Sequence, residues 1–191
     1  MNPRRKLGYM MAITGVVAGL SSRAQAQLQT AGELFVDIDA TTLPEGILNS
    51  IQNHGTLGGS FDARGGGLTV PVIAVEGGTK GIRFDGNDFM QLASGGTLIP
   101  PPVGLVGADP TRTIEVWAYN DNALAEETMV SWGKRGGGDG SNISFNYGTH
   151  GTWGALGQWG APDIGWNNAG GAPTLAKWHH LVYTFDGTTT R

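Results

Sequence analysis

The sequence predicts an all-β protein, an antiparallel sandwich of two sheets, and three observations support this. Glycine supplies 33 of the 191 residues, well above the usual share of about 7%. Many of these glycines lie between short runs of aromatic and β-branched residues, as turns lie between strands. Beyond residue 26, no helix-length segment shows a 3.6-residue apolar period. A chain of this length is sufficient for one domain with a sizeable core.

Each candidate strand is a short apolar or alternating run bounded by turn residues. Pro71 places its strand at a sheet edge or makes it begin there. The last run is the longest and is apolar on both faces, which predicts a central strand covered on both sides. In chain order, the predicted strands are residues 34–39, 69–75, 82–84, 89–92, 114–119, 128–132, 143–147 and 178–186.

The N-terminus has the three parts of a secretory signal peptide. Arg4, Arg5 and Lys6 form a basic start, residues 7–20 are apolar, and Ala24-Gln25-Ala26 matches an A-x-A cleavage site. The apolar part is shorter than the roughly 20 residues of a membrane span. The sequence therefore predicts a signal peptide over residues 1–26 and a secreted, periplasmic or cell-surface protein that begins at residue 27.

Charge and cysteine content exclude some classes of partner and of scaffold. Residues 1–26 carry four of the 12 basic residues and no acidic one, so the remainder has a formal net charge of −8. Nucleic acid is not an expected partner, because no basic stripe is present to neutralise phosphates. The chain has no cysteine, so the domain must be stable without the disulfides that small secreted domains commonly use.

Four segments, in this order, resemble the laminin-G-like jelly-roll family of bacterial exported proteins, whose fold is of the concanavalin A type. The likeness covers residues 33–191, and its last segment is the most specific. The segments are Gly81–Asp88 with Phe-Asp-Gly, Arg112–Ala118 with Thr-Ile-x-x-Trp, Met129–Lys134, and Trp178–Gly187 with Trp-His-His and a closing Asp-Gly.

The resemblance implies two packed antiparallel sheets in jelly-roll order, frequent calcium binding, and binding of sugars or glycosylated partners. In the family, the Trp-His-His strand is followed by a strand bearing Tyr-x-Asp-Gly and by further strands. Here, Asp186-Gly187 forms a predicted turn and residues 188–191 begin the next strand. The sequence thus predicts one jelly-roll domain over residues 27–191 that lacks its last strands.

Tryptophans suggest where a saccharide binds. Four of the six lie in the C-terminal quarter of the chain, interleaved with glycines that leave the backbone open. Flat aromatic faces exclude water and stack on the C–H faces of sugar rings. An alternative is that all of these rings pack inside the sandwich. The sequence predicts saccharide contacts for Trp153, Trp159 and Trp166, and core positions for Trp117, Trp132 and Trp178.

Four carboxylates are candidate calcium ligands. Asp37 and Asp39 lie two apart on a predicted strand and so face the same side, and Asp85 and Asp88 share a tight turn. Calcium takes six to eight oxygen ligands, which such turns can supply. The alternative is that these side chains only form turns.

His179 and His180 are adjacent on a predicted strand and therefore face opposite sides. They cannot readily bind one ion together, so the sequence predicts structural roles for both.

Enzymatic activity is not predicted. Glycoside hydrolysis requires two carboxylic acids about 5 to 9 Å apart, and no predicted strand carries such a pair of glutamates. Asp37 and Asp39 have the spacing but lack aromatic neighbours beyond Phe35. The leading hypothesis is a non-catalytic binding module for saccharides or glycoconjugates. A structural or adhesive surface domain with a protein partner is the first alternative, and a glycoside hydrolase of the same fold is the second.

Overall fold

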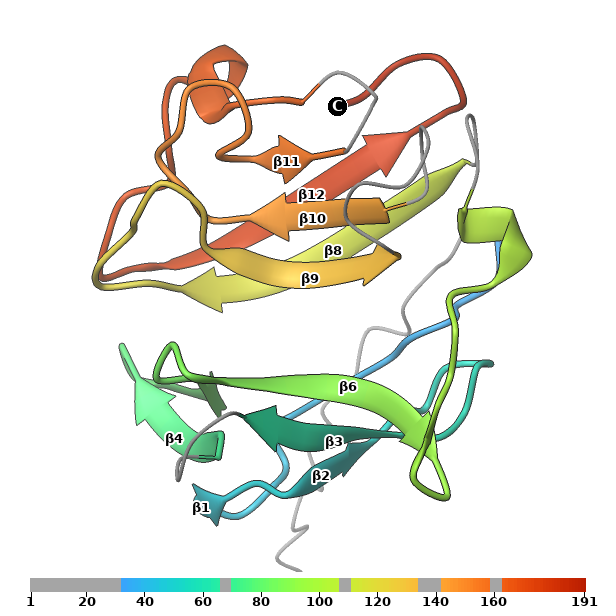
Figure 1. The fold of residues 1–191 in the computed structure, drawn as a ribbon. Helices are drawn as coiled ribbons and strands as arrows, with labels where there is room; N and C mark the ends of the chain where they lie inside the picture. The colour runs from blue at the N-terminus through green and yellow to red at the C-terminus, as the bar shows by residue number, and fades with distance from the viewer. Residues whose placement is uncertain (1–31, 66–69, 107–110, 134–141, 159–162) are drawn as a thin grey trace, which may run out of the picture. The chain divides into compact units, whose positions relative to one another are not determined.

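A computed structural model describes residues 32–65, 70–106, 111–133, 142–158 and 163–191 (Figure 1). Residues 34–191 belong to one unit. The predicted signal peptide, residues 1–26, lies outside the described residues.

Antiparallel strands build the described chain, joined by turns and by two short 3₁₀ segments, η1 (Val103–Leu105) and η2 (Trp166–Ala169). No α-helix occurs in the described residues, and the all-β prediction is confirmed. These strands form four sheets. Two come from the N-terminal half: one has the order β1 (Gly46–Ile47), β4 (Val72–Glu76), β5 (Thr79–Arg83), and the other β2 (Ser50–Gln52), β3 (Ser60–Gly65), β6 (Asp88–Ser94), β7 (Thr97–Leu98). Two come from the C-terminal half: β12 (Trp178–Phe185) pairs with β8 (Arg112–Tyr119), and the last sheet has the order β11 (Leu156–Gly157), β10 (Asn142–Asn146), β9 (Thr128–Gly133).

The family resemblance implies two sheets, whereas the structure divides the strands among four. The turn after β5 is one reason. β5 pairs with β4, but β6 pairs with β3 and β7, so the turn at Asp85-Gly86 carries the chain into another sheet and does not close a hairpin. Gly86 has φ +92°, a left-handed conformation that glycine adopts without strain.

The C-terminal pair of sheets encloses the larger apolar core. β8 and β12 form one layer and β9, β10 and β11 the other (Figure 1). Their buried side chains meet between the layers, with further half-buried apolar residues packed around them. The buried members are Ile114, Ile143, Phe145, Tyr147, Leu156, Leu181 and Tyr183.

A second, smaller core involves residues of the N-terminal sheets and is built around Leu48, Ile51 and Ile73. Trp178 joins this half of the chain to β12. Its indole Nε1–H donates to the carbonyl oxygen of Glu76 at 2.7 Å, and its ring packs against Gly81 of β5. The predicted core position of Trp178 is therefore correct only in part. The residue is half-buried, at a contact between strands rather than inside either core.

β12 was predicted to be covered on both faces, and this is wrong. Its inward residues Leu181 and Tyr183 are buried, but His180 and Val182, on the opposite face, are exposed. The predicted core position of Trp117 is wrong for the same reason. It lies opposite His180 in the neighbouring strand and is 64% exposed. Both faces of these strands carry apolar residues, so alternation did not identify the buried face.

The predicted strand over residues 34–39 is also absent, although the segment is extended. Its carbonyl groups accept hydrogen bonds from the following loop, including His54 N–H to Asp37 O at 2.9 Å and Thr56 N–H to Leu34 O at 2.8 Å. The buried Asn53 side chain completes the contact, because its Oδ1 accepts the N–H of Asp37 at 2.9 Å. Backbone hydrogen bonds to an irregular loop, together with the Asn53 side chain, here take the place of a strand ladder.

The predicted Asp186-Gly187 turn is confirmed. Thr190 forms a bridge with Phe185, so the chain runs back along β12. Asp186 Oδ1 accepts the backbone N–H groups of Thr189 and Thr188. These two bonds, and then the side-chain bond from Arg191, hold the pKa of the Asp186 carboxyl below its ordinary value.

Candidate functional site

A pocket of about 540 Å³ lies beside β12, against the loops that surround β11 and η2. This volume falls within the range of about 300 to 1,000 Å³ that is common for small-ligand sites. Its wall includes Trp166, one of the three tryptophans predicted to contact a saccharide. Asp163, Asn167, Thr152 and Tyr183 line it as well.

Backbone pairing fixes the loop that carries Trp166. Ile164 and Leu156 exchange two backbone hydrogen bonds, each 2.9 Å long. Gly165 then passes so close to Gly151 that a Cβ at residue 165 would overlap the Gly151 carbonyl oxygen. Only glycine fits there without moving one of the two loops. Trp166 follows directly as the first residue of η2.

Trp166 is half-buried and held in a defined orientation. Its indole Nε1–H donates to the Gly154 carbonyl oxygen at 3.0 Å. Its ring lies 6.2 Å from that of Phe145, centroid to centroid, at 47°. The indole thus packs against the core and also forms part of the pocket wall. A ring fixed in this way presents its surface to a ligand at a small cost in side-chain entropy.

Two exposed polar side chains line the same pocket as this ring, and each is held by a hydrogen bond. Asp163 Oδ1 accepts the backbone N–H of Gln158 at 2.7 Å. Asn167 Nδ2 donates to the Gly151 carbonyl oxygen at 3.0 Å. The second carboxylate oxygen of Asp163 and the amide oxygen of Asn167 are acceptors suited to hydroxyl donors.

A buried arginine supports the pocket and was missed by sequence reasoning. Arg112 donates from Nε to the Tyr183 hydroxyl at 3.1 Å and from Nη2 to Gln158 Oε1 at 2.7 Å. Tyr183 is a wall residue, and Gln158 in turn holds Asp163, so Arg112 positions two parts of the site. The available signal was strand alternation, because Arg112 lies on the same face as Ile114.

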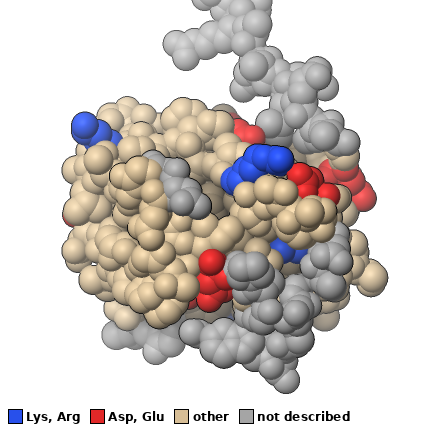
Figure 2. Space-filling model, turned by 90° about the horizontal axis from the view of Figure 1, so that it is seen from above, with Lys and Arg blue, Asp and Glu red and all other residues tan. Residues whose placement is uncertain are grey.

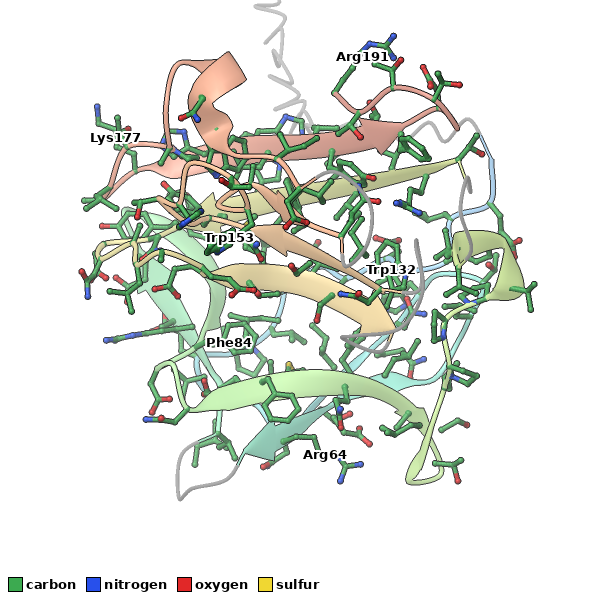
Figure 3. The ribbon with its side chains drawn as sticks, turned by 45° about the horizontal axis from the view of Figure 1, so that its top comes forward. Arg64, Phe84, Trp132, Trp153, Lys177 and Arg191 are labelled. Atoms are coloured by element: carbon green, nitrogen blue, oxygen red, sulfur yellow. The ribbon has the colours of Figure 1, made fainter. Side chains whose placement is uncertain are left out.

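Of the other two predicted saccharide-contacting tryptophans, the structure describes Trp153, and Trp153 does not line the described pocket. The Trp153 ring stacks on the His150 ring, and Trp153 is 37% exposed. It lies at some distance from Trp132 (Figure 3). Trp159 lies outside the described residues. Of the two described members of this set, Trp166 lines the pocket and Trp153 does not.

Three of the four candidate calcium ligands, Asp39, Asp85 and Asp88, accept hydrogen bonds from nearby backbone groups. Asp39 Oδ1 accepts the Thr41 hydroxyl at 2.6 Å and the Thr41 N–H at 2.8 Å, and these bonds lower the pKa of the Asp39 carboxyl. Asp88 Oδ1 accepts the Asp85 N–H at 2.9 Å. Asp37 lies on the extended segment described above. Within the described ranges, no group of three or more His, Asp or Glu side chains lies together in a way that could hold a metal ion.

The two histidines of β12 face opposite sides, as predicted. His179 Nε2 lies 2.9 Å from the Thr174 carbonyl oxygen. His180 Nε2 lies 2.8 Å from Glu115 Oε1, across the sheet. They share no partner in the described chain.

The face seen in Figure 2 carries few charged side chains. This view, from above Figure 1, looks onto the part of the molecule that holds β11 and η2. Arg191 and Asp163 are the charged residues among the described pocket wall, and Arg191 pairs with Asp186 at 3.0 Å. The pocket environment is therefore better matched to a neutral polar ligand than to a strongly charged one.

Comparison with protein-family models, with curated proteins and with solved structures finds no match for this chain. No helix in the described part of the chain is both long and apolar enough to cross a membrane.

Proposed function

We propose that this protein is a non-catalytic, exported module that binds a neutral saccharide or glycoconjugate in the pocket beside β12. One observation carries the proposal: the fixed indole of Trp166 shares a pocket wall with the acceptor groups of Asp163 and Asn167. A sugar ring has apolar C–H faces and a rim of hydroxyl groups. An aromatic surface flanked by acceptors complements both.

The wall composition favours binding over hydrolysis. Asp163 is the one carboxylate among the described wall residues, whereas glycoside hydrolysis generally uses two. Asp163 Oδ1 already accepts a hydrogen bond from the Gln158 N–H. A carboxylate held in this way is better suited to be a fixed hydrogen-bond acceptor than to be an acid that must exchange a proton.

The remaining features of the proposal come from the sequence. We propose that the four sheets belong to a jelly-roll domain of the laminin-G type, with calcium as a structural ion. The candidate calcium ligands remain Asp37, Asp39, Asp85 and Asp88. Export through the signal peptide would place the module in the periplasm, at the cell surface or outside the cell.

A retention screen of the purified protein on a panel of neutral and charged polysaccharides, with calcium and with a chelator, tests the function. Retention on a neutral polysaccharide without release of reducing sugar is the expected result. Release of reducing sugar would instead support a hydrolase. Failure to bind any polysaccharide would contradict the proposal and favour a protein partner. A loss of binding or of thermal stability with the chelator alone would support the calcium site.

Asp163→Asn isolates the contribution of the carboxylate. The amide oxygen can still accept the Gln158 N–H, so the loop should keep its shape. Replacing the second oxygen by an NH₂ group removes a charged acceptor, and such hydrogen bonds contribute about 1.5 to 3 kcal/mol. We expect saccharide affinity to fall about tenfold or more, with an unchanged melting temperature. Unaltered affinity by calorimetry would show that Asp163 does not contact the ligand.

Export is tested separately. If the signal peptide is cleaved after Ala26, N-terminal sequencing of the protein recovered outside the cytoplasm should begin at Gln27. An intact Met1 on a cytosolic product would show that this prediction is wrong. The saccharide proposal does not depend on the outcome.

A further inference from the structure

The outer face of the β8–β12 sheet, on the side opposite the larger core, carries an aromatic surface that the pocket does not use. Ile114 and Leu181 point into the core and are buried. Alternation places Glu115, Trp117 and His180 on the other side. Trp117 is 64% exposed there, so a large flat indole lies open to solvent on a regular sheet.

Two successive contacts hold this indole in place. The Trp117 and His180 rings stack with centroids 4.9 Å apart and planes 17° from parallel. His180 is fixed in turn by Glu115, through the 2.8 Å contact between Nε2 and Oε1. Together the three residues form one surface with apolar faces and polar edges.

Val182 connects this surface to the pocket. It is part of the pocket wall, yet by alternation its side chain lies on the outer face, where it is 42% exposed. It follows His180 by two residues and pairs with Glu115 across the sheet. Two residues along a strand span about 7 Å, so one such step separates Val182 from the Trp117–His180 pair.

We propose that the ligand is a polysaccharide chain that continues from the pocket, over Val182, onto Trp117. This inference rests on the proposed function and extends it: the pocket binds one part of the chain, and Trp117 stacks on a further sugar unit. Glu115 and His180 offer hydrogen-bonding groups at the edge of the indole.

Charge favours a neutral chain over an anionic one. The outward-facing residues of β8 and β12 include no lysine or arginine; they are Thr113, Glu115, Trp117, Tyr119, Trp178, His180, Val182 and Thr184. Sulfated or uronic-acid polymers would meet the Glu115 carboxylate without a compensating cation other than a protonated His180.

Chain-length dependence of binding tests the inference. Calorimetry would compare the dimer and the hexamer of the neutral glycan that the screen retains, starting with β-1,4- and β-1,3-linked glucose oligomers. The wild-type protein should bind the hexamer more tightly than the dimer. Trp117→Ala should lose this gain, about tenfold in affinity if one stacking contact is removed, and should bind the dimer as the wild type does. Trp117→Phe, which keeps a flat ring, should retain most of the gain.

The outcomes separate the two proposals. Equal affinity of the wild type for dimer and hexamer, or an unchanged hexamer affinity in Trp117→Ala, would overturn the extended site and leave the pocket standing. Failure of both oligomers to bind would contradict both proposals. A melting curve for each variant establishes that it is folded, which is expected because Trp117 is mostly exposed.

Discussion

Replacing Trp166 with alanine is expected to abolish measurable saccharide retention while the protein stays folded. The indole is the fixed aromatic surface proposed to contact the sugar inside the pocket, whose wall also holds the acceptor groups of Asp163 and Asn167. The ring also packs on Phe145, so some stability will be lost. Fully buried aromatics cost about 3 to 5 kcal/mol on truncation, and a half-buried ring should cost less.

Trp132→Ala provides the matched control. Trp132 is also half-buried and also donates its indole N–H to a carbonyl oxygen, that of Leu105 at 3.2 Å. It packs against the same core but does not line the described pocket. We expect a comparable decrease in melting temperature with unchanged retention. If both variants lose binding in proportion to their loss of stability, Trp166 is a core residue and not a ligand contact.

Gly165→Ala is expected to have the second-largest effect. Its Cβ would overlap the Gly151 carbonyl oxygen, so one of the two loops must move. Forcing extra atoms into a packed site typically costs about 1 to 3 kcal/mol. The displaced segment carries Asp163 and Trp166, so both stability and saccharide affinity should fall, as thermal melts and calorimetry would show.

Gly104→Ala is the control for this substitution. A Cβ at residue 104 would meet no heavy atom within 4 Å, and Gly104 does not line the described pocket. This variant should bind and melt almost as the wild type does. An unperturbed Gly165→Ala protein would show that the loops do not approach each other as closely as described.

Strand identity was predictable where one local pattern was strong. β8 and β12 were found from their β-branched and aromatic runs, and β4 begins directly after Pro71, as the proline indicated. β3 was missed because its sequence, Ser60–Gly65, contains Asp62 and Arg64 and has little β propensity. Pairing with β6 along its whole length forms this strand, and that pairing is not a local property of the sequence.

The site was predictable only in part, for a similar reason. Trp166 was found as an aromatic residue among glycines. Asp163 and Tyr183 were not, because they become neighbours through the Ile164–Leu156 bridge and the packing of β10 on β12. Trp117 was assigned to the core because alternation shows that two faces differ without showing which one is covered. Arg112 occupies an inward position where an apolar residue would be expected, and only tertiary hydrogen bonds explain it.

The most direct test of saccharide binding in this pocket is an NMR titration of ¹⁵N-labelled protein with the retained oligosaccharide. Each tryptophan gives its own indole N–H signal, so the ligand-contacting rings can be identified individually. We expect the largest shifts at the Trp166 indole and at the backbone amides of Asp163 and Asn167, with the Trp132 indole unchanged. Shifts confined to Trp132 or to the β1–β7 half of the chain, or no shifts at saturating saccharide, would contradict the assignment of this pocket as the binding site.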